Sequence, residues 1–529
     1  MITMKKQTIF SVAFLSLFNS ALFAQEIQKN IFLGDTVSIN TLAEKDKSAF
    51  KKLADKPDGY VATKEGKYKI QNIQYNVLNP LKDGVTKVLV IGNSFSDDGV
   101  ESYLHDMARS TGKPLVIGNL FRGGAPLDFH LKNAMENKKI YSYRKTTVDG
   151  IKSNTDKTSI LEALKDEYWD YICFQQASAT SGEWETIEAS LPQLFDYVRD
   201  NYPVSTVKYL YHQTWAYGQN AITANFQKYD RDQQLMYNKI IDVSKKVKSL
   251  IPIDKLIPSG TAIQNGRATY KGDNFNREAY HLDYVLGRFT AASTWYQTLF
   301  SDLKDVTYQP SFMTKGDVEL AKTSAISAIQ NPFSITASNE FKNQKVSYPA
   351  FDKIKVSFGS DVIIAGWLSL LYERENSARF DLLDNHNTPT SVNIKVLQNF
   401  QSRKANGTKV TSFDSEIPTH VSRTYFRAEV TKENTAKPFL LIENLNPKKN
   451  YKFTIISSVA EKLPNTLIKL KGKEEVKSWI NPSYNLTEEL IVKSLKPNAN
   501  GAVEMYFELP KGEDNAIGIV NALLIEELK

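Results

Sequence analysis

A serine in an abrupt turn is the first candidate for chemistry in this 529-residue sequence. Residues 88–91 are apolar and are followed at once by Gly92, Asn93 and Ser94. A short apolar run that ends at a glycine predicts a buried strand of a parallel sheet, and ligands bind beyond the carboxyl ends of such strands. We therefore predict that Ser94 faces a crevice and acts as a nucleophile. The alternative is a serine that only closes or caps the turn.

A serine hydroxyl needs a base to take its proton, and the few histidines can be weighed singly. His281 follows the last predicted strand, and Glu278 lies three residues before it. A carboxylate at this spacing can accept from one ring nitrogen and leave the other to face the serine. His212, which follows another predicted strand, is the rival base. The alternative for His281 is a structural place in a segment that caps a helix.

Alternating strands and helices must position these residues. From residue 86 to about 335, strands are predicted at 87–91, 115–120, 169–175, 206–212 and 255–258, with helical patterns near 100–110, 126–136, 158–167, 185–200, 230–250 and 284–300. Such alternation predicts a doubly wound parallel α/β sheet. A strand order of 2-1-3-4-5 would place the end of the first strand beside the switch point. Residues 140–154, where Tyr alternates with Arg and Lys, predict a hairpin.

The pattern changes near residue 335. Short alternating runs separated by turn residues predict an antiparallel β-sandwich with strands at 354–358, 392–397, 424–430, 439–442, 451–457, 467–470, 502–508 and 517–525. Residues 445–451 resemble the tyrosine corner of fibronectin-like sandwiches, with Tyr451 as the capping ring. Trp367, Trp479 and Tyr484 are candidate sugar platforms, with core packing as the alternative for each.

The N-terminus carries an export pattern. Lys5 and Lys6 precede an apolar run at 9–23, which is shorter than the ~20 residues that a spanning helix needs, and Ala24 is a small residue for cleavage. We expect a cleaved signal peptide and a periplasmic or secreted protein, with a short membrane anchor as the alternative. The expected division is a signal peptide at 1–24, a lead-in at 25–85, an α/β domain at 86–337 and a sandwich at 338–529.

Composition excludes other classes of site and partner. The net charge is +7, but lysines are scattered among acidic residues, which argues against a nucleic-acid partner. Cys173 is the only cysteine, so the chain has no internal disulfide and no cysteine zinc site. No segment after the first is apolar for long enough to span a bilayer.

Three sequence blocks resemble those of the SGNH (GDSL) hydrolase superfamily. Residues 92–96 read Gly-Asn-Ser-Phe-Ser and resemble its first block, Gly-Asp-Ser-Leu-Ser. Residues 278–281 read Glu-Ala-Tyr-His and resemble its last block, Asp-x-x-His, while Gly124 resembles the second-block glycine. Together with Ile-Pro-Ser-Gly-Thr-Ala-Ile-Gln at 257–264, this order of blocks is similar to an SGNH-like group common in Bacteroidetes.

The resemblance implies a flavodoxin-like three-layer fold and ester hydrolysis through an acyl-serine, with no metal and no cofactor. Carried over to this sequence, it makes Ser94 the nucleophile, His281 the base and Glu278 the acid that orients the base. Because glutamate is one methylene longer than the family's aspartate, Asp273 and Asp283 remain alternatives for that acid.

The third block of the family, Gly-x-Asn-Asp, has no counterpart with an Asn. Residues 175–178 read Gln-Gln-Ala-Ser and resemble the Gln-Gly-Glu-Ser of sialate O-acetylesterase-like members. Gln175 is therefore the predicted oxyanion donor, together with the backbone N–H groups of Ser94 and Gly124. Gln176 is the second choice for this donor. The alternative is that both glutamines only satisfy buried backbone groups.

The expected function is a secreted serine esterase that removes acetyl or another small ester group from a polysaccharide or oligosaccharide. The substrate class depends on the export pattern, the sandwich and family analogy. Trp215 and Tyr280 are candidates to line the substrate site, with a core position as the alternative. A different hypothesis is a catalytically degenerate glycan-binding protein, motivated by the missing third-block Asn and the glutamate at 278. The sequence leaves the oligomeric state open.

Overall fold

The computed structural model describes residues 60–63, 66–69, 84–409 and 411–529. The predicted signal peptide lies outside these residues, and within the predicted lead-in only residues 84–85 and an antiparallel pair, β1 (Tyr60–Thr63) and β2 (Gly66–Lys69), are described. The chain forms two compact units. Unit 1 comprises the described residues up to 214 with 238–257 and 298–307, and unit 2 comprises 215–237, 258–297 and 308–529.

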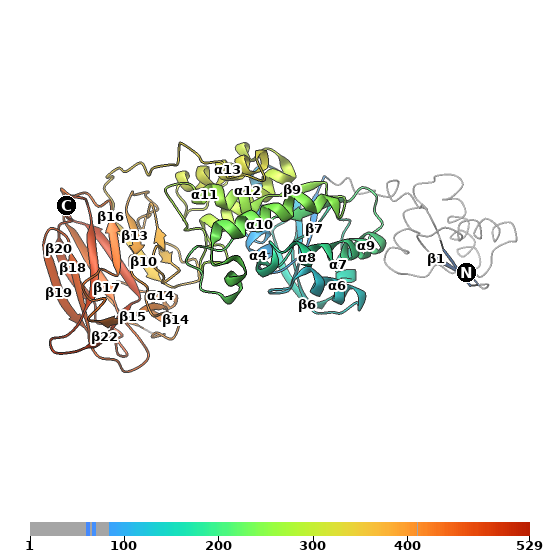
Figure 1. The fold of residues 1–529 in the computed structure, drawn as a ribbon. Coiled ribbons are helices and arrows are strands. Elements are labelled where there is room, and N and C mark those ends of the chain that lie inside the picture. The colour runs from blue at the N-terminus through green and yellow to red at the C-terminus, as the bar shows by residue number, and fades with distance from the viewer. Residues whose placement is uncertain (1–59, 64–65, 70–83, 410) are drawn as a thin grey trace, which may run out of the picture. The chain divides into compact units, whose positions relative to one another are not determined.

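Unit 1 is built on a seven-stranded sheet (Figure 1). Five parallel strands stand in the order β4-β3-β7-β8-β9, which are β4 (Leu115–Phe121), β3 (Thr86–Gly92), β7 (Tyr171–Phe174), β8 (Lys208–His212) and β9 (Lys255–Ile257). This confirms the predicted 2-1-3-4-5 order. The predicted hairpin is β5 (Tyr141–Thr146) and β6 (Lys152–Thr158), and it extends the sheet antiparallel to β4.

The first strand is apolar on both sides because both faces of the sheet are covered. Leu89 and Ile91 pack into a core with Ile172 and Phe174 of β7. That core also contains side chains of α6 (Leu127–Met135), α7 (Ile160–Leu164), α8 (Trp184–Glu188) and α9 (Leu191–Asn201). Val88 and Val90 point to the opposite face by the two-residue period of a strand and are also fully buried. A continuous apolar run is the expected pattern for such a strand.

The helices agree with most of the predicted ones. They are α4 (Ser94–Val100), α5 (Leu104–Ser110), α10 (Gln233–Lys246), α11 (Ser259–Arg267), α12 (Leu286–Phe300) and α13 (Lys315–Gln330), besides those named above. The pattern at 185–200 is two helices, since Pro192 lies in the first turn of α9, where proline favours a new start. Helix α11 was not predicted, because glycines weaken helical patterns. Gly266 is required there, since a Cβ would overlap the ring of Phe275.

The C-terminal part of unit 2 is a β-sandwich of three sheets (Figure 1). One sheet has the order β11-β10-β23-β17-β20, the second β12-β13-β16-β21-β18-β19, and the third β14-β15-β22. The strands are β10 (Lys353–Phe358), β11 (Leu368–Leu370), β12 (Ala378–Arg379), β13 (Asn393–Val396), β14 (Ser402–Lys404), β15 (Tyr425–Thr431), β16 (Leu440–Glu443), β17 (Tyr451–Ile456), β18 (Thr466–Lys471), β19 (Glu475–Ile480), β20 (Leu490–Leu495), β21 (Val503–Glu508), β22 (Asn515–Val520) and β23 (Ala522–Glu527). Within these sheets the pairing is antiparallel except between β10 and β11, which the prediction of a purely antiparallel sandwich did not contain.

One predicted strand, at 517–525, is two strands in two sheets, β22 and β23. The break falls at Asn521, which is fully buried. Its side chain donates to the carbonyl oxygens of Ser422 at 2.8 Å and Ser458 at 3.0 Å, and accepts from Ser458 N at 2.7 Å. The amide stabilises the crossing between sheets because it satisfies backbone groups that no strand pairs there.

The predicted tyrosine corner is confirmed. Tyr451 begins β17 and is fully buried, and its hydroxyl oxygen accepts a hydrogen bond from Asn446 N at 3.0 Å. The ring therefore closes the connection from which β17 starts.

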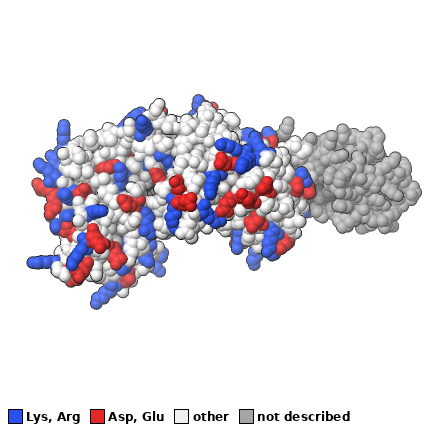
Figure 2. Space-filling model, viewed as in Figure 1, with Lys and Arg blue, Asp and Glu red and all other residues white. Residues whose placement is uncertain are grey.

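Charged side chains of both signs are interspersed on the face drawn in Figure 2. Many of them pair, such as Lys145 with Asp166 and Glu167, both at 2.7 Å. A search of the described ranges finds no helix long and apolar enough to cross a membrane.

Candidate functional site

The backbone around Ser94 makes a tight strand-to-helix turn. Gly92 ends β3, and a Cβ at this position would overlap the side chain of Ser96. Asn93 caps α4 by accepting from Phe95 N at 3.0 Å, and Ser94 is the first residue of the helix. Ser96 is fully buried and donates to Asn93 O at 2.7 Å, whereas Ser94 is partly exposed. Ser94 is therefore the accessible hydroxyl of this turn.

Asn93 links three neighbouring strand ends through side chains. Its Nδ2 donates to Ala125 O at 3.0 Å, and its Oδ1 accepts from Gln175 Nε2 at 2.8 Å. Gln175 Oε1 in turn lies 2.8 Å from Nδ1 of His212. An amide oxygen only accepts, so His212 Nδ1 carries the proton in this bond. The row from Asn93 to His212 crosses the carboxyl ends of β3, β7 and β8, where a parallel sheet binds ligands.

His212 does not fit the role of rival base. It is 1% exposed, and burial lowers its pKa to about 3, so the ring is neutral at ordinary pH. Its bond to Gln175 gives it a structural task, which is to fix the amide of Gln175.

Two of the predicted oxyanion donors, Gln175 and Gly124, are tied to Asn93. Gln175 is bonded to it directly, and the loop that carries Gly124 is held by the bond from Asn93 to Ala125. Gly124 has a φ of +68°, a left-handed conformation that glycine adopts without strain. Donation by either group to an oxyanion stays a prediction.

Gln176, the second choice for that donor, is occupied in the structure. Its Oε1 accepts from Leu127 N at 2.9 Å and from Ala177 N at 2.8 Å, and its Nε2 donates to Thr186 Oγ1 at 3.0 Å. Leu127 is the first residue of α6, so Gln176 stabilises the start of that helix. This is the structural alternative considered for the glutamines.

In unit 2, Glu278 and His281 form the pair expected from their spacing. Nδ1 of His281 and Oε1 of Glu278 are hydrogen-bonded, and Arg277 Nε lies 3.2 Å from Oε2 of Glu278. Burial raises the pKa of Glu278, but the His281 bond and the Arg277 charge outweigh it, so this pKa lies below its usual value. A carboxylate on Nδ1 leaves Nε2 as the nitrogen that can accept a proton.

The two alternative acids have other partners. Asp273 lies 2.8 Å from Arg267 Nε and accepts from Gln219 N at 2.6 Å. Asp283 caps α12 by accepting from backbone N–H groups, among them Gly287 N at 2.6 Å. Glu278 is therefore the carboxylate that the fold brings to His281.

The loop around this pair is irregular and held by side chains. Ala279 adopts a φ of +64°, which is strained for alanine, and its carbonyl oxygen accepts from Gly218 N at 2.5 Å. Trp215 is fully buried and donates from Nε1 to Tyr280 O at 2.8 Å. Trp215 thus supports the loop. Because its ring is buried, the prediction that it lines a substrate site is wrong. Tyr280 is partly exposed with its ring centroid 4.3 Å from that of His281, so it stays a candidate to contact substrate.

Sequence reasoning missed Glu101, which follows α4. Burial and the charge of Asp97 raise its pKa to about 7. Asn119 Nδ2 donates to its Oε1 at 2.5 Å, and Arg144 Nη1 of β5 lies 3.3 Å away. Acidic residues commonly follow a helix, so nothing in the sequence distinguishes Glu101, and only its burial in the structure does.

Ser94 belongs to unit 1 and the Glu278–His281 pair belongs to unit 2, and their cooperation in one centre is the prediction from the sequence. Within the part of the chain that the structure describes, no group of three His, Cys, Asp or Glu side chains could hold a metal ion. The chemistry that these groups can carry out is proton transfer and nucleophilic attack.

Comparisons with known proteins find a family model and a relative with a solved structure that match part of this chain. The model of a family described as a domain of unknown function, DUF4886, matches residues 87–328. The chain is 43% identical to a DUF4886 family protein from Bacteroides uniformis with a crystal structure, over 49% of this chain and 100% of that one, at a TM-score of 0.48. A search of curated proteins finds no match.

Two more distant solved structures are also similar to this chain. A candidate SGNH hydrolase from Slackia heliotrinireducens is 16% identical over 41% of this chain and 99% of that one, at a TM-score of 0.28. A candidate acylhydrolase from Bacteroides fragilis is 10% identical over 50% of this chain and 98% of that one, at a TM-score of 0.27. At these identities and TM-scores neither likeness bears on activity.

Proposed function

Because the chain belongs to the DUF4886 family and carries a serine turn and an acid-oriented histidine in SGNH block order, we propose that it is a serine esterase. The observation that carries the proposal is the bond between the Glu278 carboxylate and Nδ1 of His281. That bond selects the tautomer in which Nε2 can take a proton from a serine. The accessible hydroxyl of Ser94, in a turn braced by Asn93, supports it as the nucleophile.

In the proposed acylation, Ser94 Oγ attacks the ester carbonyl carbon while His281 Nε2 takes the hydroxyl proton. Glu278 stabilises the resulting imidazolium. The oxyanion accepts hydrogen bonds from the backbone N–H groups of Ser94 and Gly124 and from the Gln175 amide. The bond to the alkoxy oxygen then breaks, and that oxygen leaves as an alcohol with the proton from His281.

Deacylation repeats the steps with water. His281 removes a proton from the water as it attacks the acyl carbon, and the returning proton restores the Ser94 hydroxyl. The carboxylic acid leaves. Each proton moves between substrate, Ser94 and His281, so the cycle needs no other reactant.

We propose that the substrate is a polysaccharide or oligosaccharide carrying acetyl or another small ester group, and that the protein is exported. Two of the three candidate sugar platforms support a sugar-binding sandwich, since Trp479 is 47% exposed and Tyr484 is 59% exposed. Trp367 is 6% exposed in a hydrophobic cluster, so it is a core residue. The export proposal depends on residues 1–24 alone, and sequencing the mature N-terminus from an exporting bacterial host tests it.

One observation favours a second candidate, a glycan-binding protein without turnover. Gln175 is fully buried and both ends of its amide are bonded, to Asn93 and to His212. Only one of its two amide hydrogens is left for an oxyanion, which makes Gln175 a poorer donor than an amide with both hydrogens available.

Release of acetate from acetylated polysaccharides, and of methanol from methyl-esterified ones, tests the esterase proposal, with covalent labelling by a fluorophosphonate as the second readout. We expect ester release from at least one polysaccharide and a phosphonate adduct on Ser94 in the peptide mass spectrum. Ser94→Ala should abolish both. Glycan binding without release or adduct would reject the esterase in favour of the second candidate.

A further inference from the structure

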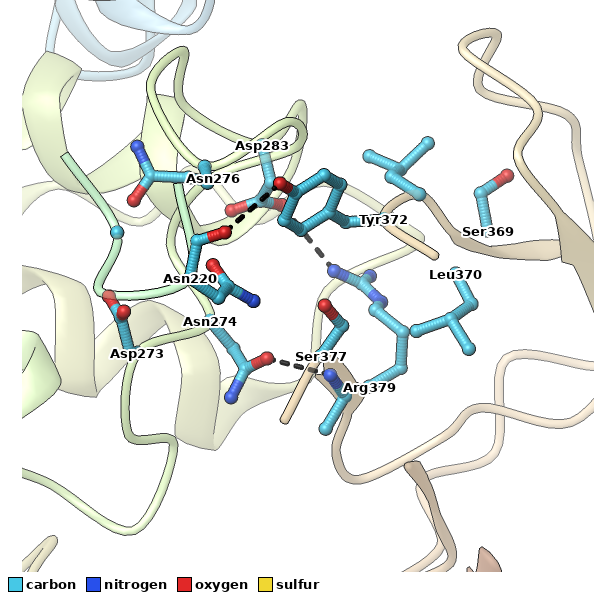
Figure 3. Close-up of a pocket in the computed structure, with 14 residues that line it drawn as sticks. Asn220, Asp273, Asn274, Asn276, Asp283, Ser369, Leu370, Tyr372, Ser377 and Arg379 are labelled. Atoms are coloured by element: carbon cyan, nitrogen blue, oxygen red, sulfur yellow. Dashed lines mark hydrogen bonds and ion pairs between the residues drawn. The ribbon is translucent and has the colours of Figure 1, made fainter. Parts of the chain in front are cut away.

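The loop 273–283, here the acid–base loop, is held on one side by the β-sandwich. Ala378 N of β12 donates to Asn274 Oδ1 at 2.7 Å, and Arg379 Nη1 lies 3.4 Å from Asp283 Oδ1. Figure 3 shows both contacts as dashed lines between two chain segments. The sandwich therefore reaches the loop near its beginning and at its end.

The sandwich also supports the acid–base loop indirectly, through the segment 218–220. Tyr372 Oη donates to Asn220 O at 3.3 Å (Figure 3), and Asn220 Nδ2 donates to Glu375 O at 3.2 Å. Two residues earlier, Gly218 N donates to Ala279 O, in the middle of the acid–base loop. The sandwich thus holds the backbone at 218–220, and that backbone in turn holds Ala279, the strained residue between Glu278 and His281.

A buried ion cluster anchors the start of the loop. Lys271 Nζ lies 2.7 Å from Asp381 Oδ2 of the sandwich and 2.6 Å from Asp317 Oδ1 of α13, and its side chain is 4% exposed. Tyr270 Oη also donates to Asp381, at 2.5 Å. Removal of one partner would leave a charge unpaired away from water, so this contact resists opening.

The space between these segments is too small for a sugar. The cavity that they line has a volume of about 20 Å³, which is room for a water molecule. Polar side chains around it already have partners: Arg379 pairs with Asp283, and Asn274 accepts from the backbone N–H of Ala378. This small cavity is therefore part of the structural contact between the loop and the sandwich.

Arg379 acts on the end of the loop through Asp283. Asp283 lies two residues beyond His281, and its side chain is 5% exposed. It accepts hydrogen bonds from the backbone N–H groups of Val285, Leu286 and Gly287 at the start of α12. Burial raises the pKa of Asp283, and the Arg379 charge opposes that rise. Arg379 thus favours the charged form of Asp283, whose oxygens accept from the backbone N–H groups at the start of the helix that follows His281.

We propose that Arg379 is a positioning residue through which the β-sandwich holds the acid–base loop in its reactive conformation, whether or not the sandwich binds sugar. This inference rests on the proposed esterase. It assigns the sandwich a part in turnover that is separate from carbohydrate binding.

The test uses the full chain and a small chromogenic acetate ester, which offers no sugar to the sandwich. Arg379→Ala should lower kcat between about tenfold and a hundredfold with KM almost unchanged, because a catalytic group displaced by about 1 Å costs that much. Arg379→Lys should recover part of the rate. Added guanidinium ion, far below denaturing concentrations, should raise the rate of Arg379→Ala alone.

Arg427→Ala is the matched control. Arg427 lies on another strand of the sandwich, pairs with Glu461 at 3.4 Å and is 23% exposed against 19% for Arg379. Its kcat should equal that of the wild type. Equal kcat values for Arg379→Ala and Arg427→Ala, or a loss at Arg379 that guanidinium does not relieve, would overturn the proposal. A wild type that cleaves no ester and takes no fluorophosphonate would instead reject the proposed esterase itself.

Discussion

The Ser94 turn and the acid–base loop are built in opposite ways. Ser94 follows a central strand whose seven residues pair with β4, and its turn is fixed by backbone geometry and by Asn93. The acid–base loop contains an alanine in the left-handed conformation. It depends on contacts with Arg379 and Ala378, which lie 96 and 104 positions along the chain from their partners in the loop. A nucleophile on a strand end is positioned by the sheet, whereas a base on a loop is positioned by whatever packs against the loop.

Removal of the nucleophile should have the largest effect on rate. Ser94→Ala should lower kcat by about 10⁶-fold, as loss of a triad serine does, while the melting temperature stays near that of the wild type because the side chain is not in the core. Ester turnover and a thermal melt check both parts.

Ser96→Ala is the control within the same turn. Ser96 is fully buried and bonded, so its loss should cost about 1–3 kcal/mol of stability and leave the rate per folded molecule nearly unchanged. The opposite result, with Ser94→Ala unfolded and Ser96→Ala inactive, would show that Ser94 is the structural serine.

Removal of the charge on the acid–base loop should come second. Glu278→Gln should lower kcat by about 10⁴-fold, because a neutral amide no longer stabilises the imidazolium or selects its tautomer. Asp273→Asn is the control, and since Asp273 pairs with Arg267 it should lower stability more than rate. A larger rate loss at Asp273 than at Glu278 would reassign the orienting acid.

The third effect concerns the two glutamines after β7. Gln175→Ala should lower kcat by about 10²-fold if its amide serves the oxyanion. Gln176→Ala should lower the melting temperature through the start of α6, with the rate per folded molecule nearly unchanged. Steady-state kinetics on folded protein separates the two, and equal kcat values in both variants would remove Gln175 from the oxyanion site.

The smallest effect is a pH dependence of stability in the Ser94 half. The pKa of Glu101 is raised to about 7, so the folded state binds more protons than the unfolded state between the ordinary glutamate pKa of 4.5 and about 7. Stability from this group is therefore complete below that window and is lost as pH rises through it. Glu101→Gln should remove this dependence of stability on pH. Between pH 5 and pH 8, the melting temperature of the wild type should therefore fall relative to that of Glu101→Gln.

Glu136→Gln is the control for that experiment, since Glu136 is exposed and its pKa is lowered, which places its own titration below this range. Melting curves of the three proteins across the same buffers are the measurement. Parallel curves for wild type and Glu101→Gln would show that Glu101 is charged in the folded protein at neutral pH.

Sequence patterns predicted most of the architecture because they report local physics. Period-two and apolar runs located the strands of the parallel sheet and most of those of the sandwich. Alternation with helices predicted a parallel sheet, and the order 2-1-3-4-5, proposed because it places the end of the first strand beside the switch point, is the order observed. The split at Asn521 was not predictable, since a single Asn in an otherwise mostly apolar run does not mark a change of sheet, and only the partners Ser422 and Ser458 give the amide its place.

The sequence by itself determined which residue types stand at the strand ends, in particular Ser94 after a buried strand and Glu278 three residues before His281. Spacing along the chain carries that information because turns and short loops are local. Folding decided what each polar group does: that His212 holds Gln175, that Gln176 caps a helix, that Trp215 is buried and that Arg379 pairs with Asp283. These outcomes depend on burial and on partners tens to a hundred residues away, which no local pattern encodes.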